Sequence, residues 1–403
     1  MKRLLLLTGW LLGLASVLAS EPTGRWVATW ATSQQLTEKG NLPPEPGFTE
    51  ATVRQKLRVS IGGEKLRVRF SNEFGNSPLT IEAAHVALAE GFADAKIQPG
   101  SSRALTFRGA ASVTLHSGAT VISDPVDLAL APMADVAITT VTKASPSDVT
   151  GHPGSRTTSY FAYGGAAPDA ADLPEAKRTD HWYFMCSLDV WTRRPAAAVA
   201  ILGDSITDGR GSTTNGNDRW PDILSQRLRA NPATADVAVL NHGVGGGRVL
   251  RDGLGISALR RFDRDIIAQP GVKWLIILEG VNDLGTSSPE TVAATAQELI
   301  SAYDQMITRA HDHGIKVYGA TIMPLGGFKN YDTPEREAAR QTVNAWIRRS
   351  GRFDAVIDFD AVARDPANPA RLSAATDGGD HLHLSAPGYK VIAESIDLGL
   401  FTR

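Results

Sequence analysis

Ser205, which lies halfway along the chain, is a residue that could take part in a chemical reaction. It follows a run of small and β-branched apolar residues, Ala198–Leu202, which predicts a buried parallel strand. Ligands of open α/β sheets bind at the carboxyl ends of the strands. A serine at that edge could be a nucleophile, although Gly-Asp-Ser taken alone also fits a simple turn.

A base and an acid that could activate a serine lie near the C-terminus. Asp380 and His383 are three residues apart, so the carboxylate can hold one ring nitrogen while the other nitrogen faces a nucleophile. Asp377 and His381 compete with them for these roles. A serine hydroxyl is a weak nucleophile until a base removes its proton, and this pairing could supply the base.

Two further stretches could donate hydrogen bonds to an oxyanion. The loop Gly243–Gly247 lets a backbone N–H approach a ligand without a Cβ in the way. Asn282 places a carboxamide just after the apolar run Val272–Leu278. Taken alone, the loop also fits a tight turn, and the asparagine fits an Asx-turn. Donors fixed around a developing oxyanion each contribute on the order of a hundred- to a thousandfold in rate.

The elements that must position these residues belong to a domain over residues 195–403. There, apolar runs alternate with amphipathic helices, which is typical of a parallel sheet covered on both faces. We therefore expect a flavodoxin-like three-layer α/β/α domain. The predicted strands are the one before Ser205, Val237–Leu240, Val272–Leu278, Lys316–Ile322 and Ala355–Phe359. Helices are predicted from Pro221, from Pro289 behind a Ser288 cap to about His313, from Pro334 to Ser350, and from about Ser385 to Leu398.

Residues 21–194 have a different pattern. Apolar and polar side chains alternate, as in Leu57–Ile61 and Leu66–Phe70, which indicates strands with one buried and one exposed face. This part is predicted to be an antiparallel β-sandwich domain. Other predicted strands are Leu79–Ile81, Val113–Leu115, Val136–Thr140 and Thr158–Tyr163.

Residues 1–20 have the layout of a secretory signal peptide. A basic start, Met1–Arg3, precedes an apolar run, Leu4–Ala19, that ends in small residues. The run is short for a membrane anchor, which needs about 20 apolar residues. We expect cleavage near Ala19 or Ser20, export to the periplasm or the cell exterior, and no membrane span in the mature chain.

Charge and metal-ligand patterns argue against several classes of partner. The formal net charge is −2 at pH 7 and no basic run is present, so nucleic-acid binding is not expected. No cysteine or histidine cluster has zinc-ligand spacing. His311 and His313 fit a predicted helix end, where the backbone dipole favours histidine. We therefore expect neither a metal nor a cofactor.

The four stretches that contain Ser205, the glycine loop, Asn282 and the pair Asp380 and His383 together resemble the sequence blocks of the SGNH, or GDSL-type, hydrolase superfamily. The resemblance implies Ser205 as nucleophile, His383 as base and then acid, and Asp380 as the group that orients His383. It also implies an oxyanion hole from the N–H groups of Ser205 and Gly246 and the side-chain amide of Asn282; Gly245 and Gly247 remain alternatives to Gly246. The blocks are Gly203–Ile206, Asn241–Gly246, Gly280–Asp283 and Asp380–His383.

The two-domain layout resembles a bacterial branch of that superfamily with an N-terminal β-domain and xylan-esterase-like members. It implies a serine esterase that removes acetyl or other short acyl groups from small-molecule or polysaccharide esters. Three alternatives are a lipase for longer acyl chains, an α/β-hydrolase and a non-catalytic glycan-binding surface protein. The α/β-hydrolase is disfavoured because Thr207 replaces the second glycine of its Gly-x-Ser-x-Gly motif.

The β-domain itself has two candidate roles. It could bind glycan as a module, or it could pack on the catalytic face and form a wall of the substrate cleft. For the second role the candidate edge is Gly151–Tyr160, which includes Arg156, because this segment is polar and glycine-rich just before a strand.

Overall fold

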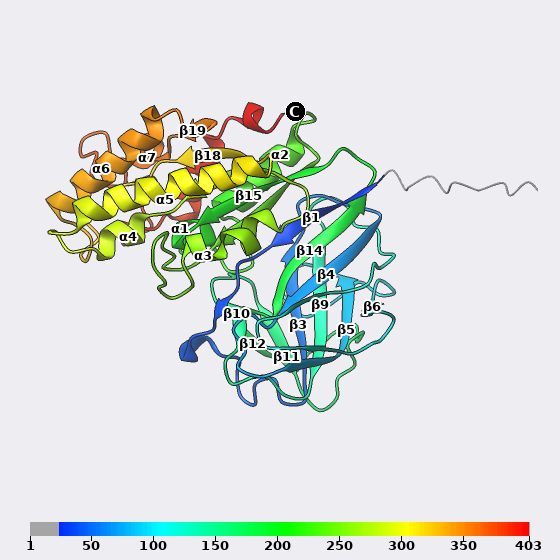
Figure 1. The fold of residues 1–403 in the computed structure, drawn as a ribbon. Coiled ribbons are helices and arrows are strands. Elements are labelled where there is room, and N and C mark those ends of the chain that lie inside the picture. Colours follow the sequence, from blue (N-terminus) through cyan, green and yellow to red (C-terminus); the bar gives the residue numbers. More distant parts are fainter. Residues whose placement is uncertain (1–23, 403) are drawn as a thin grey trace, which may run out of the picture.

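The computed structural model describes residues 24–402. The predicted signal peptide, residues 1–20, lies outside the described residues. Figure 1 shows two parts, a β region (residues 24–192) and an α/β domain (residues 195–402), joined by one short connection. Among residues 24–402, no helix combines the length and the apolar character that a membrane span requires.

The β region is antiparallel, as predicted. Its two larger sheets contribute side chains to one apolar core, for example Val68 and Leu188 from one sheet and Val53 and Ile138 from the other. One sheet has the order β1 (Arg25–Ala31), β14 (Met185–Thr192), β4 (Lys65–Ser71), β8 (Thr120–Ile122). The other has β12 (Lys177–Thr179), β11 (Ser159–Ala162), β3 (Ala51–Arg58), β9 (Asp135–Thr142), β5 (Leu79–Leu88), β6 (Arg103–Leu105), with β7 (Val113–Leu115) also on β5. A small third sheet has β13 (Trp182–Tyr183), β10 (Thr150–His152) and β2 (Gln35–Leu36).

The α/β domain contains the expected five-stranded parallel sheet. Its strand order is β16 (Val237–Gly243), β15 (Ala197–Gly203), β17 (Val272–Leu278), β18 (Lys316–Ala320), β19 (Ala355–Ile357). The helices are α1 (Ser205–Asp208), α2 (Trp220–Ala230), α3 (Ala258–Phe262, continued by a π-turn at Asp263–Ile267), α4 (Val281–Thr286), α5 (Val292–Asp312), α6 (Pro334–Arg349), α7 (Phe359–Ala363) and α8 (Ala386–Glu394). Helices α2, α7 and α8 contact one another, and α3 to α6 form a second group, so the sheet has helical layers on both faces as predicted.

The predicted start of the long helix α5 was wrong. Its first residue is Val292 and its N-cap is Thr291, not Ser288. The carbonyl of Ser288 accepts the N–H groups of Thr291 and Val292, so Pro289 and Glu290 form a turn that precedes the helix.

The last helix and the last two strands are shorter than predicted. Helix α8 ends at Glu394, and Asp397 caps a separate 3-10 turn, Leu398–Phe401, by accepting the N–H of Gly399. Strand β19 stops before Asp358, because the side chain of that residue caps α7. Strand β18 ends at Ala320. The predicted starts of α6 at Pro334 and of α8 near Ser385 are confirmed, and the side chains of Thr333 and Ser385 cap these helices.

The β region covers the edge strand of the parallel sheet. The Ser60 hydroxyl accepts the N–H of Val239 in β16 and donates to its carbonyl, each at 3.1 Å. The N–H of Ala28 in β1 donates to the carbonyl of Pro270 at 2.9 Å. An uncovered edge would present unpaired backbone groups, so this contact stabilises both parts.

Candidate active site

Ser205 is the first residue of α1, and only Asp204 separates it from the fully buried strand β15. Asp204 forms the turn, since its carboxylate accepts the N–H of Ile206 at 2.9 Å. Gly203 must lack a side chain, because a Cβ there would lie 2.2 Å from the hydroxyl of Thr207. The turn thereby places Ser205 at the carboxyl end of β15.

The structure brings Ser205, His383 and Asp380 together. The Ser205 Oγ lies 2.8 Å from the His383 Nε2, and the His383 Nδ1 lies 2.7 Å from an Asp380 carboxylate oxygen. The other Asp380 oxygen accepts the N–H groups of Leu382 and His383. An imidazole held in this way by a carboxylate presents its second nitrogen to the hydroxyl.

The competing residues Asp377 and His381 pair with each other instead. Their side chains are 2.5 Å apart, and the His381 side chain is 51% exposed. His381 also has a φ of 67°, a backbone conformation that residues other than glycine rarely adopt.

The protonation states of His383 and Asp380 follow from the surroundings of these residues. Burial lowers the pKa of His383 below 6.5, Asp380 opposes this shift, and the charges of Arg210 and Arg156 lower it further. Burial acts to raise the pKa of Asp380, but the hydrogen bonds from His383 and Leu382 outweigh it and lower that pKa. At neutral pH the ring is therefore neutral and the carboxylate is charged, which is the state a general base requires.

Asn282 lies on α4, immediately after the turn that Gly280 makes with a φ of 116°. Its Nδ2 donates to the carbonyl of Gly247 and its Oδ1 accepts the hydroxyl of Tyr331, each at 2.9 Å. These contacts fix the orientation of the amide, and one Nδ2 hydrogen is left for another acceptor. The sequence pattern did not reveal Tyr331, which follows the fourth strand by a long loop.

Within the glycine loop, the structure narrows the choice of donor. The N–H of Gly247 donates to the carbonyl of Val244 at 2.8 Å, which leaves Gly245 and Gly246 as candidates. Gly246 has a φ of 67°, a conformation that favours glycine.

A buried ionic network lies beneath these loops. The guanidinium of Arg261, 1% exposed, donates to the carbonyl of Gly203 and to Glu279, each at 3.1 Å. The second terminal nitrogen of Arg261, Nη1, donates to Asp265 at 3.1 Å and to the hydroxyl of Ser33 in the β region at 2.9 Å. Burial raises the pKa of Glu279 to about 7, and Arg261 opposes this shift. The network therefore links the turn before Ser205 to the β region.

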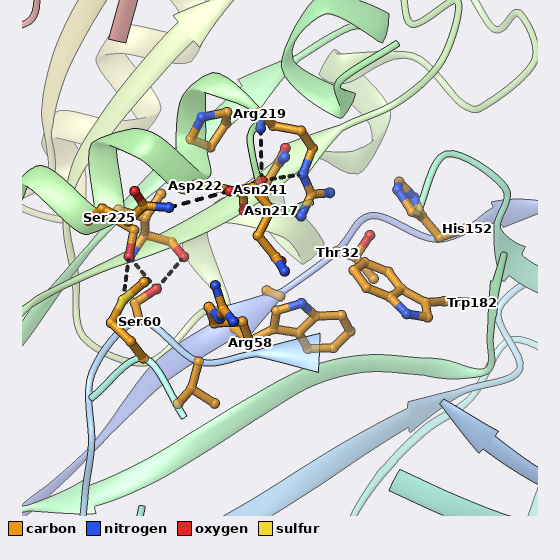
Figure 2. Close-up of a pocket in the computed structure, with 17 residues that line it drawn as sticks. Thr32, Arg58, Ser60, His152, Trp182, Asn217, Arg219, Asp222, Ser225 and Asn241 are labelled. Carbon is orange, nitrogen blue, oxygen red and sulfur yellow. Dashed lines mark hydrogen bonds and ion pairs between the residues drawn. The ribbon is translucent and has the colours of Figure 1, made fainter. Parts of the chain in front are cut away.

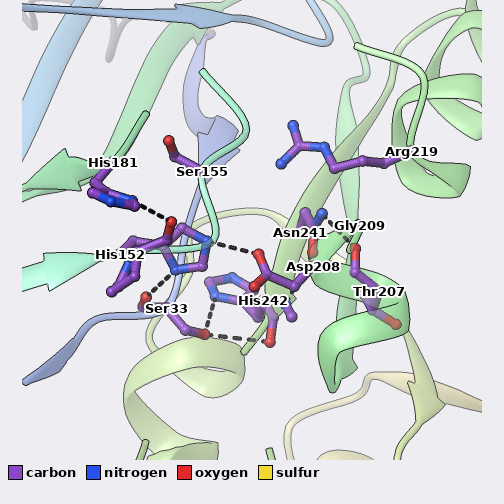
Figure 3. A network of polar contacts seen from close by, with 12 residues as sticks. Ser33, His152, Ser155, His181, Thr207, Asp208, Gly209, Arg219, Asn241 and His242 are labelled. Atoms are coloured by element: carbon purple, nitrogen blue, oxygen red, sulfur yellow. Dashed lines mark hydrogen bonds and ion pairs between the residues drawn. The ribbon is translucent and has the colours of Figure 1, made fainter. Parts of the chain in front are cut away.

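A second buried contact joins the β region to the helix that carries Ser205 (Figure 3). The His152 Nε2 lies 2.9 Å from Asp208, the last residue of α1, and its Nδ1 lies 2.8 Å from the carbonyl of Ser33. Both side chains are 3% exposed. A Cβ on Gly154 would lie 1.8 Å from the Asp208 carboxylate, so the segment Gly151–Tyr160 packs closely on the catalytic helix. The sequence singled out this segment but not the His152–Asp208 pair.

A hollow at the junction of the two parts is distinct from the reaction site (Figure 2). Its cations are already paired, Arg58 with Asp135 and Arg219 with Asp222, each at 2.7 Å. Neither Ser205 nor His383 lines it. Over residues 24–402 no cluster of His, Cys, Asp and Glu could hold a metal ion.

Solved structures resemble about half of the chain. An acetyl xylan esterase is 20% identical, with a TM-score of 0.38, over 49% of this chain and 96% of that one. An M. smegmatis aryl esterase is 16% identical, with a TM-score of 0.37, over 50% and 96%. A GDSL-like lipase from Bacteroides thetaiotaomicron is 16% identical, with a TM-score of 0.35, over 49% and 84%.

The sequence of the α/β domain matches a family model. The match covers residues 201–391, a stretch that includes Ser205, Asn282 and His383, and the model is that of the GDSL-like Lipase/Acylhydrolase family. No curated protein shows a significant sequence match to the chain. The chain therefore carries, over residues 201–391, a domain of the GDSL-like lipase/acylhydrolase family of ester-hydrolysing enzymes.

Proposed function

We propose that the protein is an exported serine esterase that removes short acyl groups, foremost acetyl, from carbohydrate esters. The observation that carries this proposal is the relay from Ser205 through His383 to Asp380, with links of 2.8 and 2.7 Å. Export is supported by the signal-like residues 1–20.

In the proposed first step, Ser205 attacks the ester carbonyl carbon while His383 takes its proton. The carbonyl oxygen becomes an oxyanion, which the N–H groups of Ser205 and Gly246 and the amide of Asn282 stabilise. His383 then donates its proton to the leaving alcohol, and an acyl-enzyme remains. Water, deprotonated by His383, releases the acid in the second step.

The pH dependence of this mechanism follows from the pKa of His383. A protonated ring cannot accept the serine proton, so activity is lost as the pH falls through that pKa. For a neutral ester we expect kcat/KM to rise with pH and to reach half its maximum below pH 6.5, the ordinary pKa of histidine. Arg210→Gln, which removes a nearby positive charge, should move this midpoint upward. A wild-type midpoint above pH 6.5 would contradict the assignment of His383.

The residues beside Ser205, His383 and Asp380 support a substrate ester whose alcohol half is polar. Arg210 is exposed, Arg156 is partly exposed, and the Asp380 side chain is 40% exposed, so the surroundings of His383 are charged and open to water. Such surroundings suit a sugar better than a lipid. The short acyl group is supported by the resemblance of the two-domain layout to xylan-esterase-like proteins.

A panel of p-nitrophenyl esters, from acetate to octanoate, tests the acyl preference, and acetylated xylan tests the alcohol. We expect kcat/KM to fall by about tenfold or more between acetate and octanoate, with acetate released from the polymer. A preference for octanoate would support a lipase. No turnover of any ester, together with binding to polysaccharide, would support a non-catalytic glycan-binding protein.

A further inference from the structure

Two arginines beside the catalytic histidine have no partner for their charge. Within residues 24–402, neither the Arg156 nor the Arg210 side chain makes a salt bridge or a hydrogen bond. The Nε of Arg156 is buried and unpaired. A buried guanidinium nitrogen is normally paired, so the missing partner of Arg156 is expected to come from outside the chain. Arg210 is exposed and open to the same partner.

The backbone of both arginines is fixed on the catalytic domain. The carbonyl of Arg156 accepts the N–H of Asn215 at 2.8 Å, and its φ of 52° is one that residues other than glycine rarely adopt. The N–H of Arg210 donates to the carbonyl of Ser205 at 2.9 Å, and its own carbonyl accepts the Tyr389 hydroxyl at 2.7 Å. These hydrogen bonds fix the backbone from which each arginine side chain extends, and that of Arg210 is tied directly to Ser205.

Three carboxylates of the surrounding loops hold other groups and form no salt bridge with Arg156 or Arg210. Asp380 holds His383, and Asp208 holds His152. Asp180 accepts the hydroxyl of Thr158 at 3.0 Å. Within residues 24–402 no carboxylate therefore forms an ion pair with either arginine, and both positive charges add to the effect of burial, which lowers the pKa of His383.

Arg210 lies on the His383 side of the site, because a Cβ on the next residue, Gly211, would lie 2.6 Å from the carbonyl oxygen of Leu384. This position identifies which half of the ester the arginines face. In the mechanism above, His383 gives its proton to the leaving alcohol, so the alcohol half occupies the space beside the imidazole. We infer that the alcohol half of the substrate carries an anion, most simply the carboxylate of an acylated uronic acid, which Arg156 and Arg210 recognise. This inference rests on the proposed esterase function.

A matched pair of esters tests it: methyl glucuronoside and methyl glucoside, each acetylated at the same hydroxyl. We expect kcat/KM to be about tenfold higher for the uronate at low ionic strength. The preference should shrink in about 1 M NaCl, where charges are screened. Equal turnover of the two esters, or faster turnover of the glucoside, would overturn the inference. No turnover of either ester, or of p-nitrophenyl acetate, would overturn the esterase proposal itself.

Variants assign the preference to the arginines. Arg156→Gln and Arg210→Gln should each reduce the ratio of the two kcat/KM values by about threefold or more, and the double variant should bring it near one. Arg156→Lys, which keeps the charge, should retain most of the ratio. Arg349→Gln, at an exposed and unpaired arginine on α6, is the control and should not change it. A ratio unchanged in the double variant would overturn the inference.

Discussion

Ser205→Ala is expected to lower kcat/KM for p-nitrophenyl acetate by at least about 10⁴-fold. The change removes the only atom that can form the acyl-enzyme in the proposed mechanism, while the oxyanion donors and the His383–Asp380 pair stay in place. The hydroxyl makes one side-chain hydrogen bond, to His383, so the free energy of unfolding should change by about 1 kcal/mol or less.

The measurement compares steady-state hydrolysis with urea unfolding of the same preparations. Ser301→Ala is the matched control, because Ser301 is an exposed serine on α5 whose hydroxyl bonds only its own helix at Gln297. It should keep full activity. If Ser205→Ala retained more than about a tenth of wild-type activity while folded, Ser205 would not be the nucleophile.

The sequence predicted the parallel sheet well, because its physical signal is local. Strand β17 is fully apolar apart from Lys273 and was placed to the residue. The short helices α1, α3, α4 and α7 were missed, since four to six residues carry too little periodicity to indicate a helix. The start of α5 was misplaced because Ser288-Pro289 has the composition of a helix start, whereas the chain uses it as a turn.

The residues of the candidate site likewise fall into those that the sequence could identify and those that it could not. Ser205, Asn282 and the pair Asp380 and His383 could be identified because each lies in a short block with its own local pattern. His152 could not, since its partner Asp208 is 56 residues away and belongs to the other part of the protein. No periodicity in the sequence reports a contact that only the packing of two domains creates.

The largest expected effect on stability comes from Arg261→Met. The substitution keeps the apolar bulk but leaves Glu279 without its cation and Asp265 with Arg264 alone. Removing one member of a buried ionic network costs about 3–5 kcal/mol. Urea unfolding followed by tryptophan fluorescence should show this loss at pH 8, with reduced esterase activity, because Arg261 also holds the carbonyl of Gly203.

Two further variants separate the effect of breaking the buried ionic network on stability from the effect of losing one positive charge. Arg260→Met removes the neighbouring arginine, which is 63% exposed and paired with Asp252 at the surface, and should cost less than about 1 kcal/mol. Ser33→Ala removes the hydrogen bond to Asp265 from the β region, and about 1–2 kcal/mol of loss is expected. Equal effects of Arg261→Met and Arg260→Met would contradict a stabilising network.

The pH dependence of the Arg261→Met effect provides an independent check. Burial already raises the pKa of Glu279 from 4.5 to about 7, so between these values the folded protein binds more protons than the unfolded chain. Stability contributed by this group is therefore lost as the pH rises. Without Arg261 the pKa of Glu279 rises further, and the carboxyl group can escape its unpaired charge by taking a proton. The destabilisation by Arg261→Met should accordingly be smaller at about pH 5 than at pH 8, whereas a loss of packing alone would be the same at both.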